Sequence, residues 1–254
     1  MLSFVMPSHV GHWGGVLFLV GLGAGFVDSI AGGGGLISLP ALLWTGLPPG
    51  LALGTNKAQS SVGTSLAVWR YHQANLIDWD KLKLVIPLTF LSALLGAEVV
   101  THLSNETLRH LLPWVLLLVA LYAIFNPQLG TETRVARLQS KTFGIIFGCL
   151  LGFYDGFFGP GTGAFWTLAL VTLAGYALPQ AVATTKVVNL ASNLGSLLLF
   201  ICRGQVILPA LMMMAGQLIG AELGTRMVIL HGAKFVRYVF IAVVLAMIVP
   251  LVFK

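Results

Sequence analysis

Long apolar runs separated by short polar turns dominate the chain, and their lengths predict membrane-spanning helices. A spanning helix needs about 20 mostly apolar residues, whereas a strand of a membrane barrel shows about 10 residues of alternating polarity. The runs in this sequence do not alternate, so we predict an all-α, polytopic membrane protein. Full-length runs lie at residues 52–69, 84–102, 109–125, 180–201, 206–225 and 235–253.

Two further apolar segments, at residues 13–45 and 142–176, are interrupted by glycine. The first contains GFVDSIAGGGGLISLP and the second contains GFYDGFFGPGTGAFWT. A glycine destabilises a helix by about 1 kcal/mol relative to alanine, so each segment predicts two short helices. We interpret each pair as a re-entrant hairpin with its tip in the membrane, since irregular backbone at that depth must be surrounded by protein or line a cavity.

The chain divides into two similar halves. LGTNKAQSS (53–61) aligns with ATTKVVNLA (183–191), and LLGAEVVT (94–101) aligns with LIGAELGT (218–225). A hairpin followed by three spans crosses the membrane an odd number of times, so we expect a two-fold inverted repeat. The expected parts are an N-terminal tail (1–12), a first transmembrane repeat (13–125), a polar linker (126–141) and a second transmembrane repeat (142–254).

The distribution of basic residues favours the inverted arrangement. It places nine of the 14 Lys and Arg residues on one side of the membrane and three on the other, whereas parallel repeats give eight and four. Cytoplasmic loops carry an excess of Lys and Arg, so both ends of the chain are expected outside the cytoplasm.

The composition decides how the net charge of +6 is interpreted. Only 9% of the residues are charged and 57% are hydrophobic, whereas a soluble domain has about 25% charged residues. We therefore attribute the positive charge to loops at a lipid bilayer and predict no nucleic-acid partner. The sequence contains no metal-ligand cluster, so we expect neither a metal site nor a cofactor.

The glycine breaks suggest an anion site. The helix that starts after each break directs unpaired N–H groups and the positive end of its dipole toward the middle of the membrane, which favours an anion. Lys57 and Lys186, about five residues inside their helices, need a counter-charge or a cavity. The predicted substrate-binding residues are Asp28, Ser29, Gly33, Gly34, Gly35, Asn56, Lys57, Asp155, Gly161, Thr162, Lys186, Asn189 and Asn193.

Each of these features also has a purely structural interpretation. Glycine runs serve helix packing, and the two aspartates suit helix-end caps. The two lysines could instead extend to the membrane surface, and most buried Asn and Thr side chains only connect helices.

Other residues suggest gating and assembly. Glu98 with Arg109 and Glu222 with Arg237 are candidate gating ion pairs, although interfacial pairs without a function are commoner. Gly216, Gly220 and Gly224 form a small-residue face that allows a homodimer.

The two glycine motifs occur together with GTNK (54–57) and TKVVNLASNLG (185–195). With these motifs, the sequence resembles the TauE/SafE sulfite-exporter family, also called the toluene-sulfonate uptake permease family. The likeness covers about residues 13–250, and within the family it is strongest to the bacterial inner-membrane YfcA type. The resemblance implies a multipass permease for small anions such as sulfite, sulfonates or sulfoacetate. The family is diverse, so neither substrate nor direction follows for this chain.

We therefore predict a secondary transporter for a small anion that works by alternating access, with Asp28 or Asp155 as candidate proton carriers. A static anion channel could use the same helix ends. An intramembrane enzyme pairing Ser29 with Lys57, or an assembly factor, is the third class, but the second half has Gly156 where the serine would be. We predict no enzyme and no catalytic residues.

Overall fold

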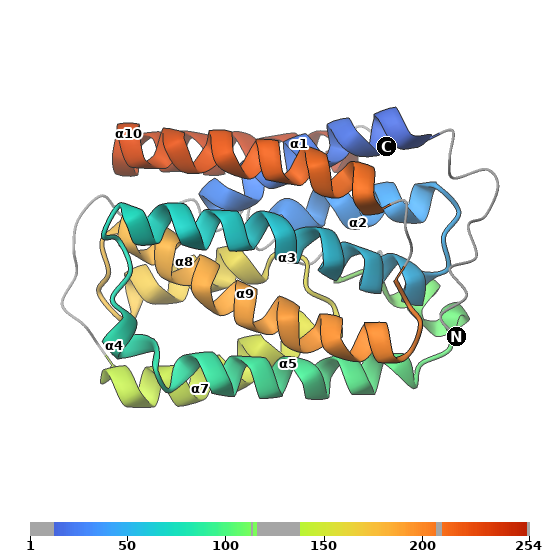
Figure 1. Ribbon diagram of the computed structural model, residues 1–254, viewed down its shortest axis with the longest axis horizontal. Helices are drawn as coiled ribbons and strands as arrows, with labels where there is room; N and C mark the ends of the chain where they lie inside the picture. Colours follow the sequence, from blue (N-terminus) through green and yellow to red (C-terminus); the bar gives the residue numbers. More distant parts are fainter. Residues whose placement is uncertain (1–12, 113, 116–137, 207–209, 253–254) are drawn as a thin grey trace.

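The computed structural model describes residues 13–112, 114–115, 138–206 and 210–252, which form an elongated bundle of helices (Figure 1). The prediction of an all-α chain is confirmed, because the described residues contain no strand. The helices are α1 (Gly14–Ala31), α2 (Gly34–Trp44), α3 (Pro49–Gln73), α4 (Trp79–Leu82), α5 (Val85–Thr101), α7 (Ser140–Phe157), α8 (Thr162–Thr172), α9 (Leu178–Cys202) and α10 (Ala210–Val252). Residues 105–112 are also helical.

Most of the predicted spans correspond to these helices. Those at 52–69, 84–102 and 180–201 become α3, α5 and α9. The runs at 206–225 and 235–253 together form α10, which has a kink at Gly232, where φ is 64° and ψ is −152°. The run at 109–125 lies largely outside the described residues.

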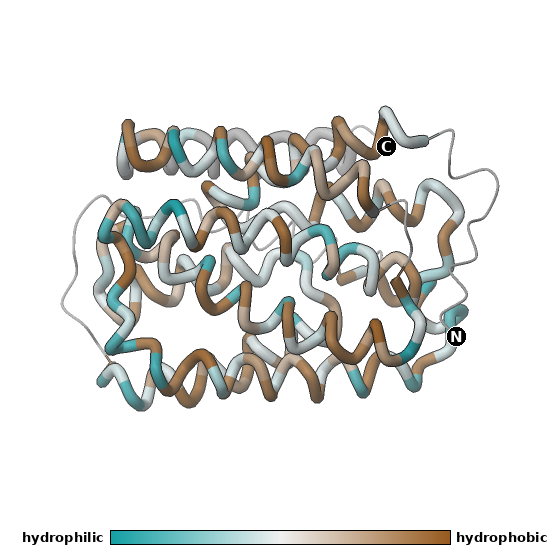
Figure 2. Tube along the Cα trace, viewed as in Figure 1, coloured by the Kyte–Doolittle hydropathy of each residue, from teal (hydrophilic) through white to brown (hydrophobic). Residues whose placement is uncertain are grey.

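Apolar side chains face outward along the bundle, as expected in lipid. Within the described residues, three helical segments are long and apolar enough to cross a membrane: Gly14–Ala31, Trp79–Thr101 and Leu178–Cys202. Figure 2 shows hydrophobic positions along the outer helix α5 and hydrophilic positions near the turns at its end. Leu91 and Leu95 on α5 and Leu150 on α7 are more than half exposed, which suits contact with hydrocarbon.

Glycine produces both helix breaks, as the sequence predicts. α1 ends because Gly32 adopts a φ of 75° and donates its N–H to the carbonyl oxygen of Asp28. In the second segment, Gly159 and Gly161 adopt φ values of 93° and 80° before α8 begins at Thr162. Pro160 lies between these two glycines and precedes the N-cap residue Gly161.

The glycine face of α10 packs within the chain, against α1. A Cβ atom on Gly216 would lie 2.0 Å from the carbonyl oxygen of Phe18, and one on Gly220 would lie 2.0 Å from that of Leu22. The third glycine of the face, Gly224, lies against the Ser29 side chain. α1 already covers this face within the described chain, and the homodimer through it stays a prediction.

A second glycine-mediated contact joins α5 to α7. Cβ atoms on Gly96 and Gly156 would lie 2.1 Å and 1.9 Å from the backbone oxygens of Phe153 and Ala93. α1 thus packs on α10, and α7 packs on α5. Each of these contacts joins a helix of the first half of the chain to a helix of the second half. Between these two pairs, α3 and α9 lie side by side and run in opposite directions (Figure 1).

Candidate anion site between the helix breaks

Two buried lysines occupy equivalent positions in the central helices. Lys57 is the ninth residue of α3 and Lys186 is the ninth residue of α9, and their exposed fractions are 2% and 0%. Eight residues of helix correspond to about 12 Å, so both lie deeper than the five residues expected from the sequence. The interpretation that they extend to the surface is wrong for this conformation.

Each lysine pairs with an aspartate from the opposite half of the chain. Lys57 Nζ lies 2.7 Å from Asp155 Oδ1 and donates a second hydrogen bond, of 3.2 Å, to Asn193 Oδ1. Lys186 Nζ lies 2.9 Å from Asp28 Oδ2. Buried charges require such partners because desolvation of an isolated ion costs several kcal/mol.

The two aspartates differ in how fully they are hydrogen-bonded. Asp155 accepts hydrogen bonds from the hydroxyls of Thr162 and Ser192 in addition to its lysine. Asp28 receives only a long, 3.4 Å hydrogen bond from the N–H of Gly34 beside its lysine. The Asp28 side chain is 14% exposed and that of Asp155 is 5% exposed, so Asp28 is the more accessible carboxylate.

Tyrosine hydroxyls fix the backbone at both breaks. Tyr71 on α3 donates a 2.8 Å hydrogen bond to the carbonyl oxygen of Ser29, near the end of α1. Tyr154 on α7 donates a hydrogen bond of the same length to the carbonyl oxygen of Pro160. Carbonyl groups that helix ends leave without partners are therefore satisfied from neighbouring segments.

A polar cavity of about 20 Å³ lies between the breaks, with room for roughly one water molecule. The predicted residues that line it are Asp28, Gly35, Asn56, Lys57, Asp155, Gly161, Thr162, Asn189 and Asn193. It also touches Gly32, Ser60, Gly159 and Gly163, which the predicted set omits. Lys186 joins the site through its ion pair with Asp28.

Ser29 does not belong to this cavity. Its hydroxyl donates to the carbonyl oxygen of Phe26, and its side chain lies against Gly224 of α10. Gly33 and Gly34 shape the start of α2 beside the cavity without lining it. Sequence analysis missed Ser192, although its place three residues after Asn189 on the same helix face could have revealed it.

Comparison with known proteins identifies the family of the chain. The sequence model of the Sulfite exporter TauE/SafE family matches residues 17–251. The chain belongs to the TauE/SafE family. No solved structure matches it.

Curated relatives agree with the TauE/SafE assignment. A "Probable membrane transporter protein" of Haemophilus influenzae is 44% identical over 223 residues, which cover 87% of this chain and 88% of the relative. "Probable membrane transporter protein YfcA" of Escherichia coli is 43% identical over 230 residues, covering 90% and 86%. This TauE/SafE chain is therefore a membrane transporter that handles a small substrate in a lipid bilayer, and it is not an enzyme.

Glu98 and Glu222 form ion pairs at the two ends of the TauE/SafE bundle. Glu98 pairs with Arg203 at 2.5 Å and with His102 at 2.9 Å, whereas Arg109 is exposed and makes no ion pair with it. The pairing of Glu98 with Arg109 is therefore contradicted. Sequence proximity suggested the wrong partner, because α9 brings Arg203 to the end of α5.

Glu222 pairs across the bundle in the same manner. It lies 2.5 Å from Arg70 of α3 and 2.5 Å from Arg226, one turn away on its own helix. The expected partner, Arg237, lies where no side chain is described. Both glutamates thus bind an arginine from the other half of the chain, at the C-terminal ends of α3 and α9.

Proposed function

We propose that this protein is a secondary transporter that moves a small anion across the bacterial inner membrane by alternating access. The candidate substrates are sulfur oxyanions and organosulfonates such as sulfite and sulfoacetate. The observation that carries the proposal is the pair of buried lysines, Lys57 and Lys186, each held by a carboxylate beside a helix break.

In this proposal the aspartates occupy the place of the substrate. An incoming anion replaces Asp155 or Asp28 as the partner of a lysine, and N–H groups at the starts of α2 and α8 add to its binding. Gly35 and Thr162, in the first turns of these helices, already line the cavity. A negative solute that displaces one of these aspartates is favoured there, because it then meets the released lysine and two positive helix ends.

An inverted repeat with two re-entrant hairpins is part of the same proposal. It is supported by the opposite directions of α3 and α9 and by the packing of α1 on α10 and of α7 on α5. α2 and α8 have 11 residues each, which is too few to span a bilayer of about 30 Å.

The size of the central cavity favours a carrier over a channel. A cavity of about 20 Å³ crossed by two ion pairs leaves no room for a hydrated anion. We assign this conformation to an occluded state that must open to load its substrate. A static pore would require a continuous wide path through the same residues.

Proton coupling follows from competition for the lysines. Protonation of Asp28 would remove its charge and leave Lys186 free to bind the anion. Anion binding and proton uptake would then be linked reciprocally, which is the requirement for symport.

Ligand-induced stabilisation tests the substrate class. The purified protein is heated with sulfite, sulfate, sulfoacetate, acetate and choline in turn, and its unfolding temperature is measured. Sulfur oxyanions should raise this temperature, because a ligand that binds only the folded state stabilises it. The double variant Lys57→Ala/Lys186→Ala should show no increase with the same anions. Stabilisation by choline alone, or equal stabilisation of the double variant, would contradict an anion site at these lysines.

A further inference from the structure

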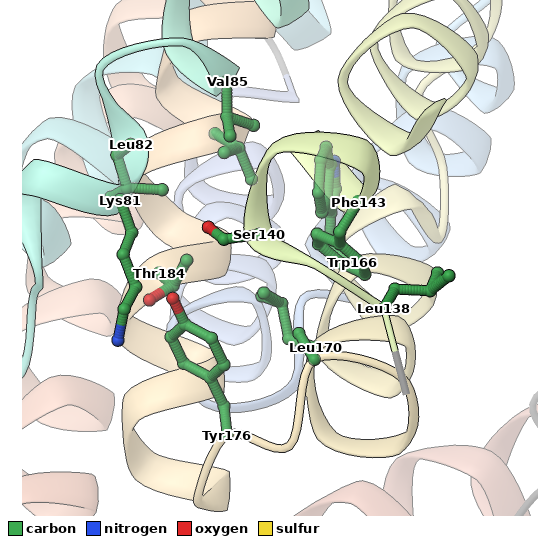
Figure 3. Close-up of a pocket in the computed structure, with 12 residues that line it drawn as sticks. Lys81, Leu82, Val85, Leu138, Ser140, Phe143, Trp166, Leu170, Tyr176 and Thr184 are labelled. Atoms are coloured by element: carbon green, nitrogen blue, oxygen red, sulfur yellow. The ribbon is translucent and has the colours of Figure 1, made fainter. Parts of the chain in front are cut away.

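A second and larger cavity lies at the end of the bundle formed by α4, the start of α7, the end of α8 and the start of α9 (Figure 3). Its volume is about 190 Å³. Apolar walls make up most of it, including Phe143, Trp166 and Leu170. An apolar cavity of about 150 Å³ can hold one benzene ring, so this cavity has room for a ring with a small substituent.

Two buried polar atoms among the lining residues have no hydrogen-bond partner. They are Nε1 of Trp166 and Oγ1 of Thr184. Trp166 is 1% exposed and Thr184 is 2% exposed. Leaving such a group buried and unpaired is unfavourable, and the indole N–H can only donate. Both therefore offer hydrogen bonds to acceptor atoms that the described chain does not supply.

The cavity also has a positive side. Lys81 is the one charged residue in its described lining, and its Nζ lies 5.5 Å from the ring centre of Tyr176. Figure 3 shows Lys81, Thr184 and Tyr176 on the side opposite Phe143 and Trp166. Lys81 also pairs with Asp78 at 2.9 Å, but both side chains are about half exposed, and such pairs contribute little.

We propose that this cavity binds a small organic anion, with a carboxylate or sulfonate group and a compact aromatic or branched aliphatic body. The acidic group lies toward Lys81 and the Thr184 hydroxyl, and the body packs against Phe143 and Trp166. The site does not depend on the proposed transport mechanism, because none of its lining residues lines the central cavity.

Calorimetric titration with benzoate tests the proposal, using the full protein in phosphatidylcholine nanodiscs. We expect saturable binding of benzoate and at least about fivefold weaker binding of toluene, which has the same ring without the charge. Thr184→Val keeps the side-chain volume and removes the hydroxyl, and Lys81→Gln removes the charge. Each should weaken benzoate binding about fivefold. Lys57→Ala should leave this binding unchanged.

Four results of the titrations in phosphatidylcholine nanodiscs would overturn the proposal. These are no benzoate binding at millimolar concentration, equal binding of toluene, unchanged affinity in both Thr184→Val and Lys81→Gln, and loss of binding in Lys57→Ala. The last would place benzoate in the central cavity. Repeating the titration in nanodiscs that contain anionic phospholipid separates a free anion from a lipid. Loss of benzoate binding there would identify a lipid as the occupant and contradict the proposal.

Discussion

At the scale of single residues, the two lysine–aspartate pairs are equivalent in position but not in environment. Asp155 is surrounded by donors from Lys57, Thr162 and Ser192, whereas Asp28 has only Lys186 and a long backbone contact. A carboxylate with fewer hydrogen bonds is easier to displace from its lysine. We therefore assign coupling to Asp28, whereas Asp155 is the more firmly held of the two carboxylates.

The first prediction concerns Asp28→Asn. In the wild-type protein, anion uptake should increase as the pH on the entry side falls, because a proton on Asp28 frees Lys186. The amide cannot take up this proton, so uptake by the variant should be nearly independent of pH in proteoliposomes. Asp78→Asn, which changes an exposed carboxylate outside the site, is the control and should keep the wild-type profile. A wild-type pH profile in Asp28→Asn would exclude Asp28 as the proton carrier.

The second prediction compares the stability of the two aspartate variants. Asp155→Asn should lower the unfolding temperature more than Asp28→Asn does, because it also disturbs two hydroxyl donors. Breaking a buried ion pair costs about 3–5 kcal/mol, so Asp155→Asn should unfold well below the wild type. Thermal unfolding in one detergent measures both variants. Equal unfolding temperatures would contradict the assigned difference between the pairs.

The sequence predicts the chemistry of these residues better than their contacts. Lysines and aspartates in so apolar a chain must be buried together or lie near a cavity, and this expectation singled out both lysines and both aspartates. The partners could not be predicted, because Lys57 and Asp155 are 98 residues apart. The same limit explains why Glu98 was assigned to Arg109, a nearby residue, instead of Arg203.

At the scale of helices, glycine performs two different tasks in this bundle. Gly32, Gly159 and Gly161 end or start helices through positive φ angles. Gly25 and Gly220 instead allow the backbones of α1 and α10 to approach each other closely. Sequence analysis identified the breaks because consecutive glycines disfavour a helix. It could not show that the glycine face of α10 meets α1, since many small-residue faces join separate chains.

The third prediction compares two glycines in α1. A Cβ atom at Gly25 would lie 2.3 Å from the carbonyl oxygen of Gln217, whereas a Cβ atom at Gly23 would meet nothing within 4 Å. Gly25→Ala should therefore separate α1 from α10 and lower the unfolding temperature. Gly23→Ala should be neutral or stabilising by up to about 1 kcal/mol, because alanine favours the helix. Similar unfolding temperatures for the two variants would contradict the observed packing of α1 on α10.

At the scale of the whole molecule, two ion pairs join the halves of the chain at opposite ends of the bundle. Glu222 binds Arg70 at one end, and Glu98 binds Arg203 at the other. In a protein that opens alternately to the two sides of a membrane, each pair would hold one end closed. The family could be predicted from sequence motifs. The ion pairs between the two halves could not, because they depend on tertiary contacts that no local sequence pattern predicts.

The fourth prediction follows from these pairs. Glu222→Gln should favour opening at the Arg70 end, and Glu98→Gln should favour opening at the Arg203 end. A partly exposed pair contributes about 0.2–1 kcal/mol, so the apparent affinity for substrate added on the weakened side should change by up to about fivefold. Transport measured in inside-out and right-side-out vesicles separates the two sides. Identical effects of both variants on both sides would contradict a role in gating.

The central claim is that Lys57 and Lys186 bind the transported anion at the meeting point of the helix breaks. Sulfite flux into proteoliposomes under a proton gradient tests it most directly, with wild type, Lys57→Ala, Lys186→Ala and the control Lys141→Ala. We predict saturable wild-type flux, a decrease of about tenfold or more in each buried-lysine variant, and unchanged flux in Lys141→Ala. Wild-type flux in both buried-lysine variants, with the protein folded, would contradict the account.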